Sequence, residues 1–410
     1  MKLKYVPGGI CAPTGFTAGA THCGVRPNKK KNDLAIILSD RNADCVSAGL
    51  YTTNRVKAAP VQLDIETGRS GHCRAICVNS GIANACAPHG MERALEMQQA
   101  AAEALGIPAD EVLVGSTGII GKELNIHRIR EGIDVVAHNL EHTEDASNEV
   151  AHAILTTDTF KKELACRFQV GGRTVTLGGI SKGSGMVHPN MGTTLTYLTT
   201  DLAITSTMLR QVLKEVCDVT FNRVSIDGEM STNDSLIILA NGLADNEIID
   251  RECRDLDHFR VALLDICTRF ARMIAKDGEG AKHLVTCTVH GASTEEEGVA
   301  LAKSVIQSTL TKTAVFANDA NWGRIMVAMG YSNIPFNPEH VRIDFLSEAG
   351  EITVCRNGVG VDIDEDYASE ILGEDEIEIR ITIDNGNASA TCWGCDITYD
   401  YIKLNGNYRK

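Results

Sequence analysis

The spacing of apolar and polar positions predicts strands and helices along the whole chain. The clearest case is 377–383, where isoleucine at every odd position alternates with polar residues, the period of a half-buried strand. Short apolar runs predict further strands over 34–38, 75–79, 112–114, 195–198, 235–240 and 341–345. Helical spacing or strong helix formers predict helices over 91–105, 133–142, 202–216 and 259–274. Ser293 and Glu296 have the spacing of a capping box and predict a helix that runs to about residue 310.

These elements follow one another without a linker, a low-complexity tract or a repeat of fixed period. The mixture predicts an α/β (mixed α+β) protein. A length of 410 residues favours two or three domains, or one large two-layer unit.

Composition and charge argue against several classes of partner. The hydrophobic share of 43% and the charged share of 23% are those of a soluble globular protein. A net charge of −15 argues against nucleic acid or an acidic membrane, because those partners require a basic face. No apolar run reaches the roughly 18 residues of a membrane helix, and the first residues show no signal peptide. We therefore expect a cytoplasmic protein with no nucleic-acid partner and no membrane partner.

The fourteen cysteines predict reduced thiols, mostly in the core of an unexported protein. Cys392 and Cys395 have C-x-x-C spacing, but no second pair or paired histidine motif completes a four-ligand zinc site. Cys73 and Cys77, beside His72, lack a fourth ligand in the same way. We expect no metal site.

Candidate chemistry is concentrated in 181–195, a glycine-rich stretch with one lysine, Lys182, which ends in Gly192-Thr193 and an apolar run. Glycine lets a ligand approach the backbone N–H groups closely. Upstream, 115–122 is similar to a phosphate loop but does not match that motif, because Ile120 stands where the motif has glycine. Its Thr117-Gly118 pair predicts a tight turn that presents backbone N–H groups.

Thr193 is a candidate nucleophile, released by self-cleavage of the bond that follows Gly192. A threonine hydroxyl needs a base, and cleavage would give Thr193 a free α-amino group with a pKa of about 7.7–8.0. The tetrahedral oxyanion needs fixed donors, for which Thr117-Gly118 is a candidate. The residues alone leave an ordinary loop-to-strand junction open as the alternative. His188, nearby in the sequence, is more often structural than catalytic, since no third group is visible to orient it.

Blocks around the candidate nucleophile carry a resemblance to a known family. They are Lys182-Gly183-Ser184-Gly185-Met186, Pro189-Asn190-Met191 and Leu198-Thr199-Thr200-Asp201. Further blocks span nearly the full length, at 78–81, 83–85, 115–118, 156–159, 231–234, 277–281, 321–325 and 393–396. In this order they resemble the ornithine acetyltransferase family, which includes the bifunctional glutamate N-acetyltransferases of arginine biosynthesis.

The resemblance implies cleavage into an α chain, 1–192, and a β chain, 193–410, which stay associated as an α2β2 heterotetramer. It implies that Thr117 and Gly118 supply the oxyanion hole. It also places substrate contacts at Thr156, Lys182, Thr193, Glu279 and Asn405. The implied fold is an ornithine-acetyltransferase/DmpA-like fold of stacked sheets and helices, similar to the N-terminal nucleophile hydrolases but distinct in topology.

The implied reaction moves acetyl from N2-acetylornithine to glutamate through an acetyl-threonine intermediate, in arginine biosynthesis and without a cofactor. Acetyl-CoA stays open as a second acetyl donor. In this interpretation Lys182 holds the α-carboxylate of the substrate and Glu279 pairs with its side-chain ammonium. From the residues alone, the favoured interpretations are a solvated loop lysine for Lys182 and a surface acid at a helix end for Glu279. For Thr156, a residue that only makes turn hydrogen bonds is the alternative.

Two positions depart from the family pattern. Gly192 replaces the usual alanine before the nucleophile, as in family members of clavulanic acid pathways. Lys410 replaces the usual final threonine or serine, which puts a cation where a hydroxyl would touch the substrate. The alternatives are therefore a threonine-nucleophile aminopeptidase or amidase, a clavulanate-pathway paralogue, and a binding protein without activity.

Overall fold

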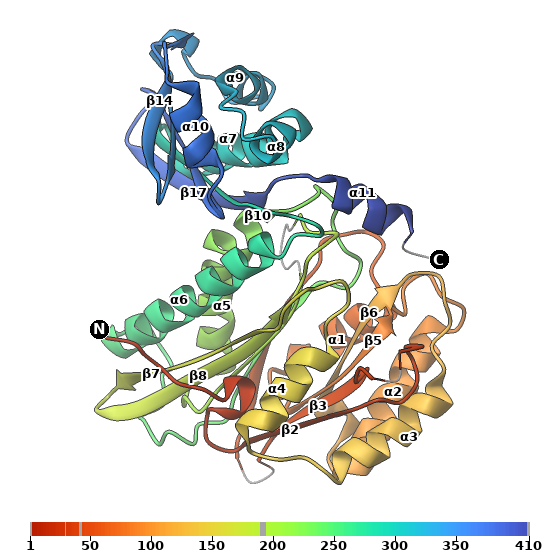
Figure 1. The fold of residues 1–410 in the computed structure, drawn as a ribbon. Coiled ribbons are helices and arrows are strands. Elements are labelled where there is room, and N and C mark those ends of the chain that lie inside the picture. Colours follow the sequence, from red (N-terminus) through yellow and green to blue (C-terminus); the bar gives the residue numbers. More distant parts are fainter. Residues whose placement is uncertain (1, 29, 41–42, 189–193, 408–410) are drawn as a thin grey trace. The chain divides into compact units, whose positions relative to one another are not determined.

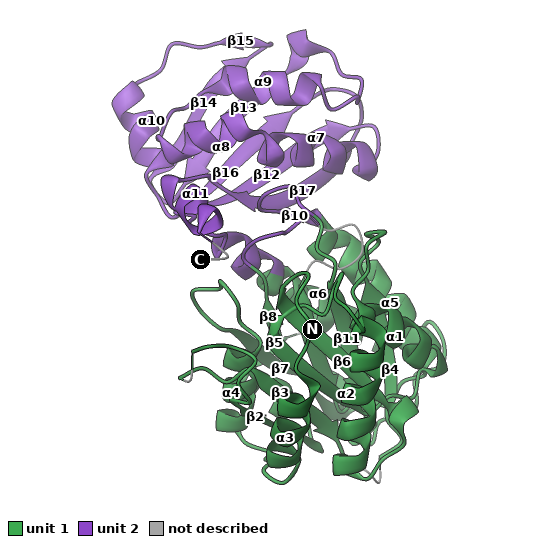
Figure 2. Cartoon of the chain, turned by 90° about the vertical axis from the view of Figure 1, so that its right-hand side faces the viewer, with its two compact units in different colours: residues 1–183, 189–222, 230–270 green, residues 184–188, 223–229, 271–410 purple. Residues whose placement is uncertain are grey.

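The computed structural model describes residues 2–28, 30–40, 43–188 and 194–407 (Figure 1). The chain divides into two compact units, coloured green and purple in Figure 2. Unit 1 comprises Met1–Gly183, Pro189–Asn222 and Met230–Phe270, and unit 2 comprises Ser184–His188, Arg223–Glu229 and Ala271–Lys410. Each unit has its own sheets and helices and is described by itself below.

Unit 1 is built on two sheets. Within the described residues, one sheet has six strands, in the order β1 (Lys4–Tyr5), β7 (Lys162–Val170), β8 (Arg173–Lys182), β9 (Leu195–Thr200), β11 (Ser235–Ala240) and β4 (Val46–Tyr51). The other has four, in the order β2 (Phe16–Thr21), β3 (Leu34–Ser39), β5 (Ala75–Ile82) and β6 (Val112–Ile119). The pairs β9–β11 and β5–β6 are parallel, and the other pairs in these sheets are antiparallel.

The two sheets share a core, and the position of β3 explains the continuous apolar run from Leu34 to Leu38. Ala35 and Ile37 pack into a cluster with Ile180 of β8, Tyr197 of β9 and other residues of the six-stranded sheet. The alternate residues, at 34, 36 and 38, pack into a second cluster with helices. A strand covered on both faces needs a continuous apolar run, because neither face meets water.

Helices cover the outer faces of these sheets. The second cluster joins the four-stranded sheet to α1 (Ala59–Thr67), α2 (Gly90–Leu105) and α3 (Ile126–Ala137), while α4 (Glu144–Ala153) packs into the cluster shared by the two sheets. On the other side, α5 (Ser206–Val219) packs against β4, and Phe270 of α6 (Arg254–Lys276) lies against Gly179 of β8. Unit 1 is thus a four-layer arrangement of helices, sheet, sheet and helices.

Unit 2 contains one mixed sheet. Its strand order, over the residues the structure describes, is β10 (Val224–Ser225), β17 (Ala388–Cys395), β12 (Leu284–Ala292), β16 (Glu376–Thr382), β13 (Arg342–Ser347), β14 (Gly350–Arg356) and β15 (Val359–Gly360). Its helices are α7 (Glu295–Gln307), α8 (Thr309–Phe316), α9 (Trp322–Gly330), α10 (Glu365–Leu372) and α11 (Tyr399–Gly406). In β16, Ile377, Ile379 and Ile381 are buried and the residues between them are partly exposed, which confirms the predicted half-buried strand.

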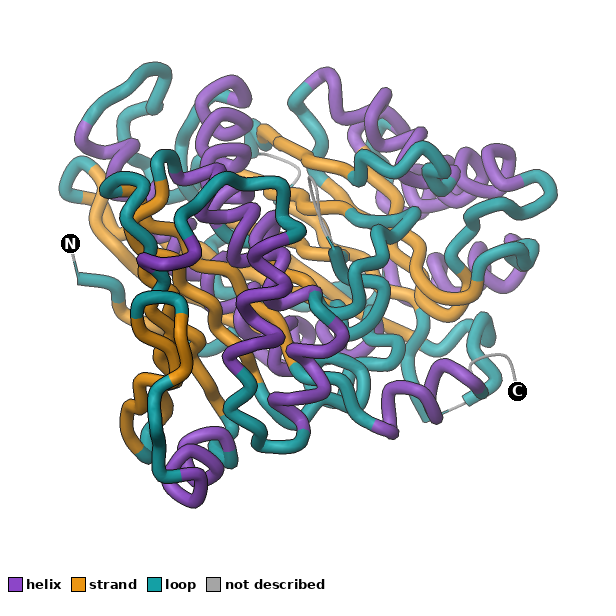
Figure 3. The backbone as a smooth tube through the Cα atoms, turned by 90° about the horizontal axis from the view of Figure 1, so that it is seen from above, coloured by secondary structure: helices purple, strands orange, loops and turns teal. Residues whose placement is uncertain are grey.

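The predicted mixture of strands and helices is confirmed throughout the described chain (Figure 3). Three predicted helix starts are wrong, because the residue that caps the N-terminus of the helix is not the one that the sequence pattern indicated. Thr294, rather than Ser293, caps α7 by accepting from the N–H of Glu297, and Ser308 ends that helix and caps α8. Similarly, Asn125 and Thr205 cap α3 and α5, so these helices run over 126–137 and 206–219 rather than 133–142 and 202–216.

The two units do not coincide with the predicted cleavage products, because unit 1 contains residues from both 1–192 and 193–410. The division at residue 192 is a statement about covalent processing and stays a prediction. Across the described residues, no helix combines the length and the apolar character needed to cross a membrane.

Candidate active site

Thr117 and Gly118 lie at the end of β6, not in the tight turn that the sequence predicts. They pair with Ser80 and Gly81 of the parallel strand β5, and the register of this ladder shifts directly afterwards. Gly118 has φ 131°, and a Cβ at this position would lie 2.3 Å from the carbonyl carbon of Gly81. Only glycine fits where two backbones approach so closely. This close approach explains why position 118 is a glycine although the chain makes no turn there.

Asn233 fixes the segments around this strand end. Its side-chain amide donates to the carbonyl of Ser116, at 2.8 Å, and to that of Ala83, at 2.7 Å. Ser116 in turn donates from its hydroxyl to Oδ1 of Asn79, at 2.6 Å. These hydrogen bonds are buried, so they hold the Thr117-Gly118 segment in one conformation.

Asp158 is the centre of a buried polar cluster in unit 1. Its Oδ1 accepts from the Lys162 ammonium at 2.9 Å and from the Gly183 N–H at 2.7 Å, and its Oδ2 accepts from the Thr156 N–H at 3.0 Å. Burial by itself raises the pKa of this carboxyl, but Lys182, Lys162 and the N–H donors outweigh it. The pKa of Asp158 therefore lies below its ordinary value, and the group is ionised.

Lys182, at the end of β8, lies against the same cluster and is 8% exposed, so it is not a solvated loop lysine. Its Nζ is 4.0 Å from Oδ2 of Asp158 and 3.5 Å from the hydroxyl oxygen of Thr117. Burial lowers the pKa of Lys182, and the carboxylate of Asp158 opposes that effect. The structure thus brings together Thr117, Thr156 and Lys182, three of the predicted site residues.

The strand β9 begins two residues after the candidate nucleophile. Thr194 is buried, and its carbonyl accepts from the N–H of Ser235 at 2.8 Å. Its hydroxyl lies 2.7 Å from that of Thr196, which is also 2.7 Å from the hydroxyl of Ser181. Three predicted site residues, Gly192, Thr193 and Lys410, lie outside the described residues.

Unit 2 brings together the other two predicted contacts, Glu279 and Asn405. The side-chain amide of Asn405 donates to Oε2 of Glu279 at 2.7 Å. Glu279 is 9% exposed, so it is not a surface acid, and its N–H donates to the carbonyl of Ser184 at 2.8 Å. A Cβ at Gly185 would lie 2.4 Å from the carboxyl carbon of Glu279, so this glycine allows the close approach.

Glu279 also lines a cavity of about 100 Å³ within unit 2. Asp227, Lys312, Asp396 and Tyr401 line it as well, together with the apolar side chains of Ile226 and Ile397. Elsewhere in the unit, a ring nitrogen of His188 lies 2.6 Å from the amide nitrogen of Gln307 and 3.2 Å from the hydroxyl of Ser225. These contacts are those of a structural histidine.

Comparison with known proteins identifies the family. A sequence model described as the ArgJ family matches residues 17–410. The arginine biosynthesis bifunctional protein ArgJ of Caldanaerobacter subterraneus subsp. tengcongensis is 45% identical over 408 residues, which cover 99% of this chain and 100% of the relative. This chain belongs to the ArgJ family.

A second relative agrees with this membership. The glutamate N-acetyltransferase of Methanocaldococcus jannaschii is 42% identical over 414 residues, covering 99% of this chain and 100% of that protein. Among solved structures, ArgJ from Bacillus halodurans is 38% identical with a TM-score of 0.49, covering 52% of this chain and 98% of that one. An ornithine acetyltransferase from Mycobacterium tuberculosis, complexed with ornithine, is 34% identical with a TM-score of 0.43, covering 46% and 100%. Membership of the ArgJ family makes this chain a transferase of arginine biosynthesis.

Sequence reasoning missed two members of the cluster in unit 1. Asp158 stands in a block that carries the family resemblance, but its role as the common acceptor for Thr156, Lys162 and Gly183 appears only in the fold. For Lys162, the sequence offered one indication of its role: it stands four residues after Asp158, the residue with which it forms an ion pair. Within the described part of the chain, no group of three or more His, Cys, Asp or Glu side chains is placed to hold a metal ion.

Proposed function

We propose that this ArgJ-family chain cleaves itself before Thr193 and then transfers acetyl from N2-acetylornithine to glutamate. The observation that carries the proposal is the family match over 17–410, together with a relative of 42% identity that is named a glutamate N-acetyltransferase. The buried cation Lys182 beside Thr117 supports it, because a substrate with an α-carboxylate needs such a partner near the reacting group.

In the processing step, the Thr193 hydroxyl attacks the carbonyl carbon of Gly192, and the peptide nitrogen leaves as the α-amine of Thr193. Water then hydrolyses the resulting ester, which leaves a carboxylate on Gly192 and restores the hydroxyl. The products are residues 1–192 and 193–410, and we expect them to remain associated as an α2β2 heterotetramer in the cytoplasm. No cofactor takes part.

In the transfer step, the α-amine of Thr193 removes the hydroxyl proton, and the oxygen attacks the acetyl carbonyl of N2-acetylornithine. Donors at Thr117 and Gly118 stabilise the tetrahedral oxyanion, worth about 10²–10³ in rate for a typical single donor. The amine returns the proton to the leaving nitrogen, so ornithine departs and an acetyl-threonine ester remains. The amine of glutamate then attacks this ester, which yields N-acetylglutamate and free Thr193.

The remaining predicted residues have assigned roles in this scheme. Lys182 binds the α-carboxylate of N2-acetylornithine, Glu279 binds its side-chain ammonium, and Asn405 orients Glu279 through the 2.7 Å hydrogen bond. Thr156 contacts substrate, and Lys410 places a cation at the last position of the chain. Acetyl-CoA is left open as a second donor.

The purified protein is incubated with N2-acetylornithine, with and without glutamate, and ornithine, acetate and N-acetylglutamate are measured. We expect stoichiometric N-acetylglutamate and ornithine with glutamate, and release of ornithine limited to one turnover without it. Sustained release of ornithine and acetate without glutamate would instead establish an amidase that uses water as the acceptor. The variant Thr193→Ala is expected to be inactive in both reactions.

A further inference from the structure

The segment Ser184–His188 is held inside unit 2 by residues that come later in the chain. The carbonyl of Ser184 accepts from the N–H of Glu279 at 2.8 Å, and the carbonyl of Val187 accepts from the N–H of Ile226 at 2.8 Å. The side chain of Val187 is buried. The segment therefore belongs to the packing of unit 2, with which it is coloured in Figure 2, although the strands before and after it, β8 and β9, belong to unit 1.

Asp227 makes the central contacts to this segment. Its Oδ2 accepts from the N–H of Met186 at 2.6 Å, and its Oδ1 accepts from the N–H of Val187 at 2.9 Å. Oδ1 also accepts from the N–H of Glu229 at 3.2 Å, and Oδ2 from the hydroxyl of Tyr401 at 3.5 Å. A carboxylate that accepts from two successive N–H groups fixes the orientation of both peptide planes. Met186 has φ 56°, in the left-handed region, so its backbone conformation needs such support.

The contacts of Asp227 cross the division that the proposed self-cleavage makes. Residues 184–188 belong to the first product of that cleavage, and Asp227 belongs to the second. On the other side of the cleavage point, Thr194 is held in unit 1, because its carbonyl accepts from the N–H of Ser235 at 2.8 Å. The chain is thus anchored both before and after residues 189–193.

We propose that Asp227 is a positioning residue for self-cleavage, which holds 184–188 so that the carbonyl of Gly192 is presented to the hydroxyl of Thr193. A chain held at both ends samples fewer conformations than one held at a single end. An intramolecular attack is fast only when the reacting atoms are kept about 3–3.5 Å apart. The proposal rests on the self-cleavage of the proposed function. The bonds that form and break are those of its processing step, in which Asp227 neither takes a proton nor forms a bond.

The test compares Asp227→Asn with Asp364→Asn, because both replace a carboxylate that accepts from two backbone N–H groups in unit 2. Asp364 caps α10, where its Oδ1 accepts from the N–H groups of Asp366 and Tyr367. Each chain is synthesised in a cell-free translation system, and its uncut and cut forms are followed over time on a denaturing gel. We expect Asp227→Asn to slow the cleavage about 10- to 100-fold, and Asp364→Asn to cleave at the wild-type rate.

The stability of each variant is measured separately, in a chain that cannot cleave itself. Each aspartate variant is combined with Thr193→Ala, and urea unfolding should show that both double variants are fully folded without urea. Slow cleavage of Asp227→Asn then reports the geometry of the folded chain and not an unfolded fraction. Asp227→Glu keeps the charge and both oxygens on a longer side chain, so its cleavage rate should lie between those of Asp227→Asn and the wild type.

Cleavage of Asp227→Asn at the wild-type rate would overturn the positioning role, and so would equal slowing in Asp364→Asn. If Asp227→Asn does not fold, Asp227→Glu takes its place, and cleavage of that variant at the wild-type rate would overturn the role in the same way. A wild-type chain that stays uncut would instead refute the proposed self-cleavage, and this inference with it. The time courses of the wild type and of the variants therefore report the two failures separately.

Discussion

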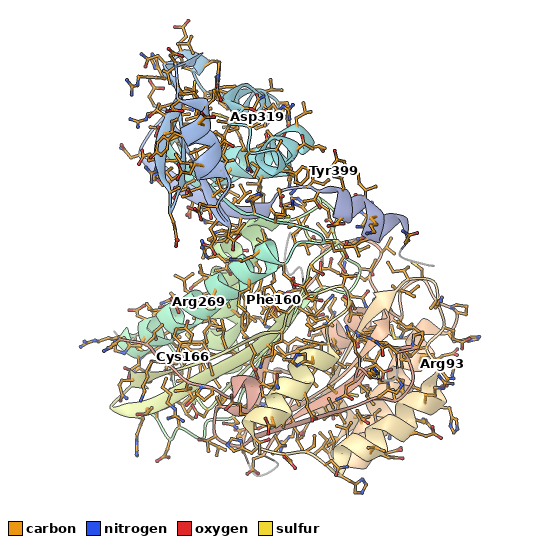
Figure 4. The ribbon with its side chains drawn as sticks, in the orientation of Figure 1. Arg93, Phe160, Cys166, Arg269, Asp319 and Tyr399 are labelled. Carbon is orange, nitrogen blue, oxygen red and sulfur yellow. The ribbon has the colours of Figure 1, made fainter. Side chains whose placement is uncertain are left out.

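The side-chain amide of Asn405 donates a 2.7 Å hydrogen bond to the Glu279 carboxylate, which joins residues 126 positions apart. The helix that carries Asn405, α11, is held in unit 2 by an aromatic contact. The ring of Tyr399, labelled in Figure 4, meets that of Phe316 edge to face at 5.6 Å. A carboxylate held in this way is suited to a cationic ligand, because the hydrogen bond from Asn405 to Oε2 fixes the orientation of the carboxylate group.

The role of Glu279 is tested with two acetyl donors. Glu279→Gln removes the negative charge and keeps the shape, so we expect the KM for N2-acetylornithine to rise 10- to 100-fold, the size of a lost charged hydrogen bond (~1.5–3 kcal/mol). N-acetylnorvaline has the same chain without the amine, and its KM should not change. A loss of the same size with both donors would assign Glu279 a structural role instead.

Asn405→Leu is expected to reproduce part of this effect. It removes the donor to Oε2 of Glu279 but leaves the charge, so the KM for N2-acetylornithine should rise less than in Glu279→Gln. Asn407→Leu, a change two residues further along, serves as the control, because the side chain of Asn407 donates only to the carbonyl of Lys403 among the contacts described for it. Equal effects of the two asparagine variants would contradict the orienting role.

Gly118→Ala is expected to be far more harmful than Gly121→Ala. Both glycines have positive φ, of 131° and 82°, but a Cβ at Gly118 meets the backbone of Gly81 at 2.3 Å, whereas nothing lies within 4 Å at Gly121. Strain alone costs ~1 kcal/mol at Gly121, and the added clash should cost ~2–3 kcal/mol or more at Gly118. Urea unfolding measures both, and equal losses of stability would show that β5 and β6 separate easily.

His188 gives a dependence of stability on pH. Burial, with a contribution from the Lys303 ammonium, lowers the pKa of His188 from 6.5 to about 4. The unfolded chain therefore binds the proton between those values and the folded chain does not, so folding is weakened as the pH falls from 6.5 to 4. His188→Gln should flatten this slope in urea unfolding, and the same change at the exposed His127 should not. An unchanged slope in His188→Gln would contradict the assignment.

The fourteen cysteines give a prediction that needs no variant. All are free thiols in the structure, and Cys86 and Cys253 are the exposed ones. Burial raises the pKa of most of the others, that of Cys392 to about 12, which suppresses the reactive thiolate. A thiol reagent should label two groups quickly in the native protein and fourteen after denaturation. Fewer than fourteen in the absence of reductant would reveal a disulfide.

Patterning predicted the strands well because their burial repeats along the sequence. The apolar run at 34–38 and the alternation at 377–383 both follow directly from which faces of a strand meet the core. The starts of helices were harder to predict from the sequence. Capping by Thr294 or Thr205 depends on the backbone conformation of that one residue, and not on a repeating pattern of apolar positions.

For the site, the sequence identified single residues but not their groupings. It placed Thr117-Gly118 in a turn because Gly-containing pairs after a short apolar run usually form one, whereas the structure continues the strand to Ile119. It could not reveal that Asp158 joins Thr156 to Lys162 and lies within reach of Lys182, because those contacts depend on where β7 and β8 run. The grouping of these residues around Asp158 is therefore a finding of the structure alone.

The most direct test is to determine the covalent state of the purified active protein under denaturing conditions. Intact mass and N-terminal sequencing should show two polypeptides, residues 1–192 and a second chain that begins Thr193-Thr194-Leu195, and Thr193→Ala should give one uncut chain. A single unbroken polypeptide in a preparation that transfers acetyl to glutamate would contradict the account.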